Sequence, residues 1–214
     1  MEERKLTPEE SMDLITSMIK NTTKHFTKGE GNMLLFWGYL CVAVIILKEI
    51  CSYLKFAKGI DIPFVPYNIL WLIPLIGIPY TLYAKRRDDQ TRKVMTYTDK
   101  ISGMLWSYVL WLALAAFLIG SFFFIVGFPA WYVMELYAFF VIGMAVSIQG
   151  IIISEKSMIF GGAFSVICGG IIVIGRTYQI TPIVMVSSLL LMGSFIVMMI
   201  IPGHILNRKT DKEL

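Results

Sequence analysis

The chain has 214 residues, of which 57% are hydrophobic and only 16% are charged, and its formal net charge is +4. So few polar residues cannot cover the surface of a soluble globule of this size, which excludes an ordinary water-soluble domain. The composition therefore predicts an all-α polytopic protein whose surroundings are a lipid bilayer.

A polar segment over residues 1–32 precedes the first apolar run. Thr7-Pro8-Glu9-Glu10 combines a helix N-cap, a proline at the first helical position and a glutamate at the third, which is the pattern of a capping box. One face of the following helix would carry the apolar residues Met12, Ile15, Ile19 and Phe26. We expect an amphipathic cytoplasmic helix that lies on the membrane or bundle, or that docks a cytosolic or membrane protein.

Six apolar runs are long enough to cross the hydrocarbon core, which takes ~20 helical residues. They cover about residues 33–54, 67–84, 101–126, 130–153, 158–175 and 182–201. The sequence thus predicts a six-helix transmembrane domain over 33–206 and a cytoplasmic tail over 207–214. Pro74 and Pro79 predict a kink in the second run, because proline removes a backbone donor from a helix.

The distribution of lysine and arginine predicts the orientation. Most of them lie in the N-terminal segment, in the connection over 85–100 and in the C-terminal tail, all on one side of six spans. The other side holds Lys48, Lys55, Lys58 and Arg176. Since basic connections stay in the cytoplasm, we expect both termini to be cytoplasmic.

The segment KRRDDQTRK, residues 85–93, is the strongest of these topogenic signals. An alternative role is the binding of anionic lipid head groups by Lys85, Arg86, Arg87, Arg92 and Lys93. The same charges would also suit nucleic acid, but the reading as a topogenic loop is favoured and no nucleic-acid partner is expected.

Motifs for chemistry are missing from the sequence. Its two histidines, His25 and His204, have no carboxylate or cysteine at metal-ligand spacing, and no Ser-His-acid set or phosphate-binding glycine loop is found. Cys41 and Cys51 share the first run and Cys168 lies in the fifth, so the cysteines suggest neither a disulfide framework nor a metal cluster. We therefore expect no enzyme, no catalytic residue, no metal and no cofactor.

The fourth run carries two polar residues, Glu135 and Gln149, in the stretch VMELYAFFVIGMAVSIQG. In a regular helix, Glu135 would lie about 7 Å below the outer boundary and Gln149 within about 40° of the same face. Intramembrane charges usually find partners, and the outer-side cations are Lys48 and Arg176. Two readings remain open: a structural clasp between Glu135 and Arg176, or a ligand, ion or proton site that includes Gln149.

Small residues recur at every fourth position in the fifth run, at Gly161, Ser165 and Gly169. This spacing lets helix backbones approach closely in a membrane, so the fifth helix is predicted to be central. The short connections between the last four runs predict sequential antiparallel neighbours.

The start LTPEESMDLITSMI and the end IIPGHILNRK, together with the six-run layout, resemble a family of small six-span bacterial inner-membrane proteins. The resemblance implies that fold and compartment, and no named activity. The leading hypothesis is a non-enzymatic membrane partner or sensor subunit. The alternative is a small channel or transporter, which would form a homo-oligomer and place Glu135 on its pathway.

Overall fold

The structure, a computed structural model, describes residues 30–59, 69, 72–91, 97–126 and 132–213. This described part is all-helical and contains no strand, which confirms the predicted all-α class. Its helices long and apolar enough to cross a membrane are five: Gly31–Lys55, Tyr97–Phe123, Val133–Ile152, Lys156–Thr177 and Ser187–Lys209. The predicted amphipathic N-terminal helix lies almost entirely outside the described residues.

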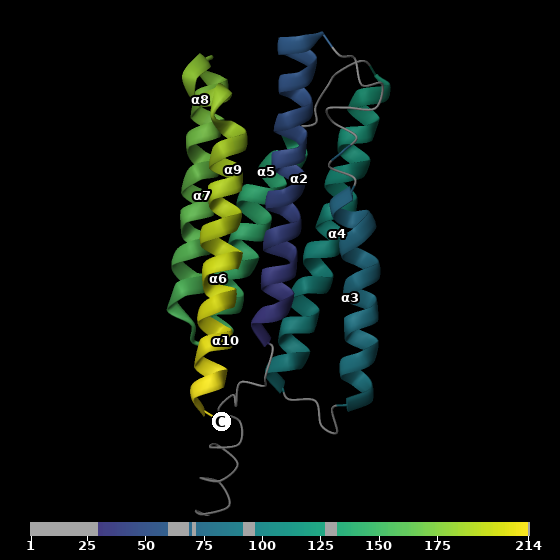
Figure 1. Cartoon of the computed structure of the whole chain (residues 1–214), viewed down its shortest axis with the longest axis vertical. Coiled ribbons are helices and arrows are strands. Elements are labelled where there is room, and N and C mark those ends of the chain that lie inside the picture. The colour runs from purple at the N-terminus through teal and green to yellow at the C-terminus, as the bar shows by residue number, and fades with distance from the viewer. Residues whose placement is uncertain (1–29, 60–68, 70–71, 92–96, 127–131, 214) are drawn as a thin grey trace, which may run out of the picture.

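The helices follow one another as shown in Figure 1. They are α2 (Glu30–Lys58), α3 (Leu72–Thr91), α4 (Tyr97–Ile125), α5 (Tyr132–Tyr137), α6 (Gly143–Ile152), α7 (Lys156–Thr177), α8 (Thr181–Met185), α9 (Ser187–Phe195) and α10 (Ile201–Glu213). Two π-helical turns, η2 (Ala138–Ile142) and η3 (Ile196–Ile200), join α5 to α6 and α9 to α10. Each α–π–α set therefore forms one long helix, and neither π turn was predicted.

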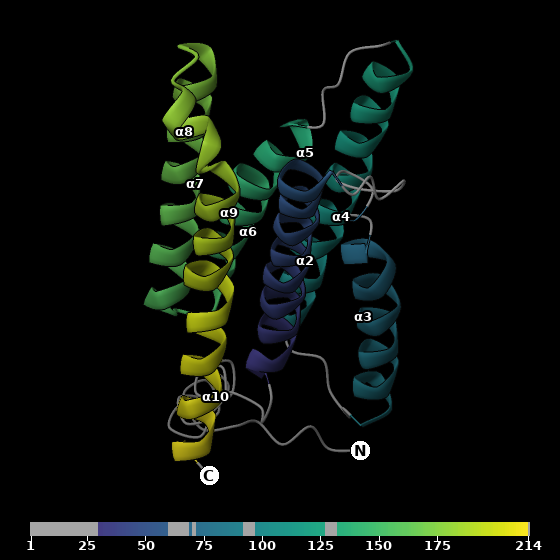
Figure 2. The same ribbon diagram turned by 45° about the horizontal axis from the view of Figure 1, so that its top comes forward.

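Helix α7 packs closely against α6 and against α9, η3 and α10. Its opposite face is exposed, and the helix lies at the edge of the bundle in Figures 1 and 2, so the prediction that it is central is wrong. A Cβ added to Gly161 would lie 2.5 Å from the Val197 carbonyl oxygen, and one added to Gly169 would lie 2.7 Å from Phe139 Cβ. Both glycines thus allow contacts that a side chain would block. The predicted close packing of the fifth span is confirmed.

Helix α3 packs against α2 at the edge of the molecule, as Figures 1 and 2 show. The rings of Phe36 and Tyr80 stack with centroids 3.8 Å apart, and Trp37 Nε1 donates a hydrogen bond to Thr81 Oγ1 at 3.1 Å. Gly77 provides the space for the Trp37 ring. The contact between these two helices is thus largely aromatic.

The second predicted span differs from the helix observed in that region. The described helix begins at Leu72 and continues through the charged residues to Thr91, so most of the segment over 85–93 is helical rather than a loop. Lysine, arginine and glutamine are good helix formers, and no glycine or proline follows Pro79 to end the helix. Because of these charges, α3 is not among the described helices apolar enough to cross a membrane.

The last helix also differs from its prediction. It begins at Ser187, after the separate short helix α8, and continues to Glu213, so the predicted tail over 207–214 is helical almost to its end. Pro202 does not end it. The π turn η3 ends at Ile200, two residues before this proline, near the place where a regular helix would lose a hydrogen bond because proline has no N–H.

Candidate functional site

An ion pair joins α5 to α7 near the end of the bundle opposite the C-terminus. Arg176 Nη2 donates to Glu135 Oε2 at 2.5 Å. The Glu135 side chain is 17% exposed and that of Arg176 is 36% exposed, so the carboxylate is the more enclosed partner. The predicted contact between these residues is present. The predicted ligand or ion role of the same residues stays a prediction.

The positions of both charges in their helices favour this pair. Glu135 lies in the first turn of α5, where the partial positive charge of the helix N-terminus stabilises a carboxylate. Arg176 lies in the last turn of α7, where the partial negative charge stabilises a cation. The helix α7 ends just beyond it with Gln179 in the left-handed conformation, and Ile180 N donates to Gly175 O at 2.8 Å.

Lys48, the other predicted cation for Glu135, points elsewhere. Its Nζ donates to Ser188 Oγ at 2.9 Å and to Glu49 Oε1 at 3.2 Å. These contacts link α2 to the start of α9. Arg176, and not Lys48, is therefore the partner of Glu135.

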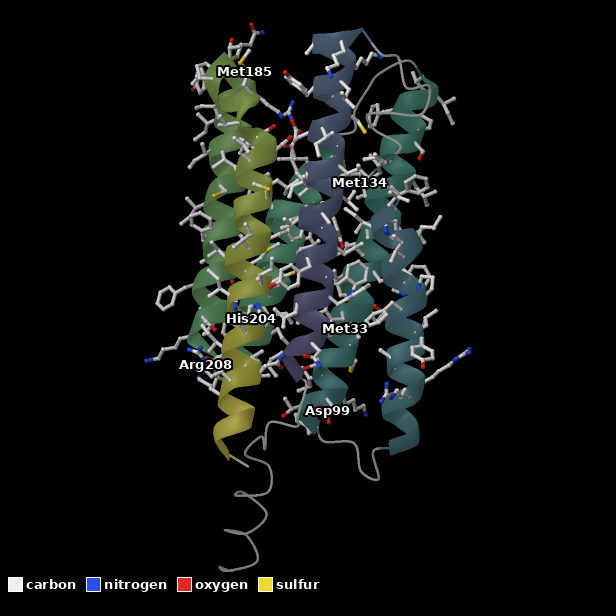
Figure 3. The ribbon with its side chains drawn as sticks, viewed as in Figure 1. Met33, Asp99, Met134, Met185, His204 and Arg208 are labelled. Carbon is white, nitrogen blue, oxygen red and sulfur yellow. The ribbon has the colours of Figure 1, made fainter. Side chains whose placement is uncertain are left out.

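A shallow hollow of about 770 Å³ opens beside the Arg176 side chain. Its lining comes from α5, α7, α8 and the turn between α7 and α8: Leu136, Val173, Arg176, Thr177, Gln179, Thr181 and Met185. Figure 3 shows Met185 at this end of the molecule and Arg208 at the other. The volume is within the range of small-molecule sites. The hollow is nevertheless open rather than enclosed, and Arg176 is the charged residue of its lining.

Gln149 is not part of this site. Its Nε2 donates to Ser102 Oγ on α4 at 2.9 Å, whereas Glu135 contacts α7. The prediction that Glu135 and Gln149 share one face is wrong, because η2 lies between them. A π turn takes up one extra residue and so rotates the following positions by roughly 100° relative to a regular helix.

The buried Gln149 side chain is only partly satisfied. Its Oε1 has no hydrogen-bond partner in the described part of the chain. Gln149 therefore links α6 to α4 through a single hydrogen bond.

The residues predicted to contact lipid head groups lie apart from the ion pair. Lys85, Arg86 and Arg87 are exposed near the end of α3. Arg92 and Lys93 lie outside the described residues. Burial therefore does not keep these three side chains from a membrane surface. Their binding of lipid head groups stays a prediction.

A second ion pair, between Glu155 and Lys209, was missed in the sequence. Lys209 Nζ donates to both carboxylate oxygens of Glu155 at 2.7 Å, and the Glu155 side chain is only 5% exposed. Glu155 stands at the N-terminus of α7, and Lys209 lies on α10. A carboxylate between two apolar runs was the available signal, but nothing in the local sequence identifies a partner 54 residues away.

The same end of the bundle holds a third polar link, between α10 and α2. Asn207 Oδ1 accepts from Gly31 N at 3.0 Å, and Asn207 Nδ2 donates to Asn32 Oδ1 at 2.7 Å. Asn207 thereby satisfies a backbone donor in the first turn of α2, which has no partner within the helix. Polar contacts thus fasten the helices at both ends of the bundle.

The described residues include no group of three or more histidine, cysteine or acidic side chains that could hold a metal ion. Comparison of the chain with models of protein families, with curated proteins and with solved structures finds no match. The described fold is that of an all-helical protein with helices suited to a membrane.

Proposed function

We propose that the chain is a non-enzymatic integral membrane protein that serves as a partner or sensor subunit. In this proposal it crosses the bacterial inner membrane six times, with both termini in the cytoplasm. The basic residues of α3 and α10 and the layout of the apolar runs support that topology. A cytosolic or membrane partner would bind through the N-terminal segment.

The observation that carries the proposal is the use of the interior polar residues. Glu135 is paired with Arg176, Glu155 with Lys209, and Gln149 with Ser102, and each contact joins two helices. Between the two ends the fully buried large side chains are mainly apolar: Phe139, Val146, Met158, Ile172 and Met198. Such an interior supports a fixed framework better than a conduction pathway, which needs polar groups at successive depths.

The second candidate function is a small oligomeric channel or transporter. The hollow beside Arg176 favours it, since an ion or ligand entering from that side would meet Arg176, the partner of Glu135. In this alternative, Glu135 would exchange Arg176 for the transported species.

A double-mutant cycle separates the two functions. We expect Glu135→Gln and Arg176→Gln each to destabilise the detergent-solubilised protein by about 1 to 2 kcal/mol, since either change removes the charge-assisted hydrogen bond that joins α5 to α7. The double variant should lose less than the sum, because each single variant already removes the same ion pair, which can be lost only once. Thermal unfolding measures the coupling, and Lys48→Gln is a control for the loss of an outer-side cation.

The same variants in lipid vesicles test transport. We expect wild type and Glu135→Gln to give equal ion flux, at the level of empty vesicles. Flux through the wild-type protein that Glu135→Gln changes, with additive and near-zero losses of stability in the cycle, would instead establish the transport function.

The proposed topology makes a separate prediction about accessibility. A thiol reagent that cannot cross membranes should label Lys58→Cys in intact cells, and should label Lys85→Cys only after permeabilisation. Both side chains are exposed, so a difference in labelling would report the side of the membrane. The reverse pattern, or equal labelling of both in intact cells, would overturn the orientation.

A further inference from the structure

The helix α4 has an uncovered face along almost its whole length. Its packed side carries the buried residues Val109, Ala116 and Gly120. The opposite side carries large side chains that are each more than half exposed: Met104 55%, Tyr108 69%, Trp111 67%, Leu118 58% and Phe122 63%. In Figures 1 and 2, α4 lies on the side of the bundle away from α7 and α9.

The residues on this face recur with alternating spacings of four and three. The series, which we call the α4 stripe, is Met104, Tyr108, Trp111, Ala115, Leu118, Phe122 and Ile125. Such a spacing has the 3.5-residue period with which two helices keep one seam in contact over several turns. Leu110, Leu112 and Ile119 of the same helix are exposed as well, so the series marks the middle of a wide uncovered face.

Two members of the stripe carry polar groups at a depth where an unsatisfied polar group costs free energy. Tyr108 and Trp111 lie near the middle of this 29-residue helix, whereas such rings in membrane proteins gather at the two interfaces. Neither the Tyr108 hydroxyl nor the Trp111 indole N–H makes a hydrogen bond to any described residue. In hydrocarbon each would be unsatisfied, which disfavours lipid as the neighbour of this face.

The surface of the stripe is self-complementary in size. Met104, Ser107, Tyr108 and Trp111 line a shallow hollow of about 360 Å³. A Cβ added to the neighbouring Gly103 would meet nothing within 4 Å. Gly103 and Ser107 are four residues apart, the spacing of small residues that admits another helix, and the bulky Tyr108 and Trp111 lie beside them. One copy of the face thus offers both the hollow and the large side chains to fill it.

We propose that a second copy of this chain packs its α4 stripe against the first, in a parallel two-fold dimer. Two copies in one membrane share one orientation, so a two-fold axis along the membrane normal brings identical residues together. The Tyr108 and Ser107 hydroxyls and the Trp111 N–H then find partners across the interface. The stripe has no charged residue between Met104 and Ile125 that would oppose the approach.

The area that such a contact would bury is that of a small protein interface, in which close packing and the polar groups of Tyr108 and Trp111 would drive association. Aromatic side chains bury about 150 to 250 Å² each, so Tyr108, Trp111 and Phe122 at their observed exposures contribute roughly 400 Å² per copy. Met104 and Leu118 raise this to roughly 600 Å² per copy. The total of about 1,200 Å² reaches the lower end of stable protein interfaces.

The test is energy transfer between donor-labelled and acceptor-labelled full-length chains in vesicles of zwitterionic and anionic phospholipid. We expect transfer above the level of random encounters, and we expect the Tyr108→Ala, Trp111→Ala double variant to require roughly tenfold more protein per lipid to reach it. The matched control is Leu110→Ala with Leu112→Ala. These residues are 54% and 50% exposed and lie about 100° to either side of Trp111, so this change should leave transfer as in wild type.

Disulfide cross-linking tests the geometry of the dimer. Ala115→Cys lies on the stripe and should give a cross-linked dimer above the background from the native Cys41, Cys51 and Cys168, whereas Leu112→Cys should give none. Random-level transfer in wild type would overturn the proposal and leave the stripe facing lipid. Equal losses of energy transfer in both pairs of alanine variants, or equal cross-linking at positions 112 and 115, would also overturn the proposal.

Discussion

Replacing Gly162 by alanine is expected to destabilise the protein by about 3 kcal/mol or more, a larger effect than any other single methyl group should have in α7. The added Cβ would overlap the Gly143 carbonyl oxygen and the Ser147 hydroxyl, and would lie 2.7 Å from the Ser147 backbone nitrogen. Two of these three atoms belong to the backbone of α6, which cannot rotate away as a flexible side chain can. Overpacking of this kind costs about 1 to 3 kcal/mol even where side chains can adjust.

Gly170 provides a matched control on the same helix. A Cβ at this position would meet nothing within 4 Å, and alanine is the better helix former by up to about 1 kcal/mol. Gly170→Ala should therefore leave the thermal midpoint of the detergent-solubilised protein unchanged or raise it. Equal shifts of the midpoint in the two variants would contradict the close contact between α6 and α7.

The sequence predicted the features of this bundle that depend on local spacing. Gly161, Ser165 and Gly169 identified the helix that others approach closely, although this helix lies at the edge of the bundle and not at its centre (Figure 1). Arg176 was predicted as the partner of Glu135 because it directly follows the neighbouring span. In both cases residues close together in the sequence, or on consecutive helices, contained the needed information.

The π turns could not be predicted in the same way. Residues 138–142 and 196–200 read AFFVI and IVMMI, and a helix that is apolar on all sides has no periodicity from which an extra residue in one turn would be visible. The consequence was the wrong face for Gln149. The hydrogen bond of Ser165 Oγ to the Phe139 carbonyl oxygen, at 3.1 Å, shows that tertiary contacts involve the backbone of η2.

The contacts at the other end of the bundle depend on pairs far apart in the sequence. Asn207 contacts Gly31 and Asn32, and Lys209 contacts Glu155. These contacts could not be predicted, because hydrophobic periodicity carries no information about which helix ends lie next to each other. Lys209 lies on the part of α10 that continues past the predicted end of the last span. The prediction of a cytoplasmic tail over 207–214 left both links unseen.

The pair of Glu155 and Lys209 leads to a prediction about whether one substitution raises or lowers the stability of the protein. We expect Lys209→Gln to destabilise the protein by about 2 kcal/mol, because it leaves a carboxylate that is 5% exposed without its cation. Glu155→Gln should cost less, under about 1 kcal/mol, since the Lys209 side chain it leaves behind is 49% exposed and water can solvate it. The N-terminus of α7 offsets part of the cost in Lys209→Gln, because its partial positive charge still faces the carboxylate.

In the Lys209→Gln background, adding Glu155→Gln should therefore stabilise the protein, although the same change destabilises wild type. This reversal distinguishes an enclosed ion pair from two independent surface charges, whose effects would add. The control is Lys156→Gln, which removes the same charge from an exposed neighbour of Glu155 and should shift the thermal midpoint little. The midpoints of the four members of the cycle in detergent measure the sign directly, and a further loss of stability in the double variant would show that Lys209 does not stabilise the Glu155 carboxylate.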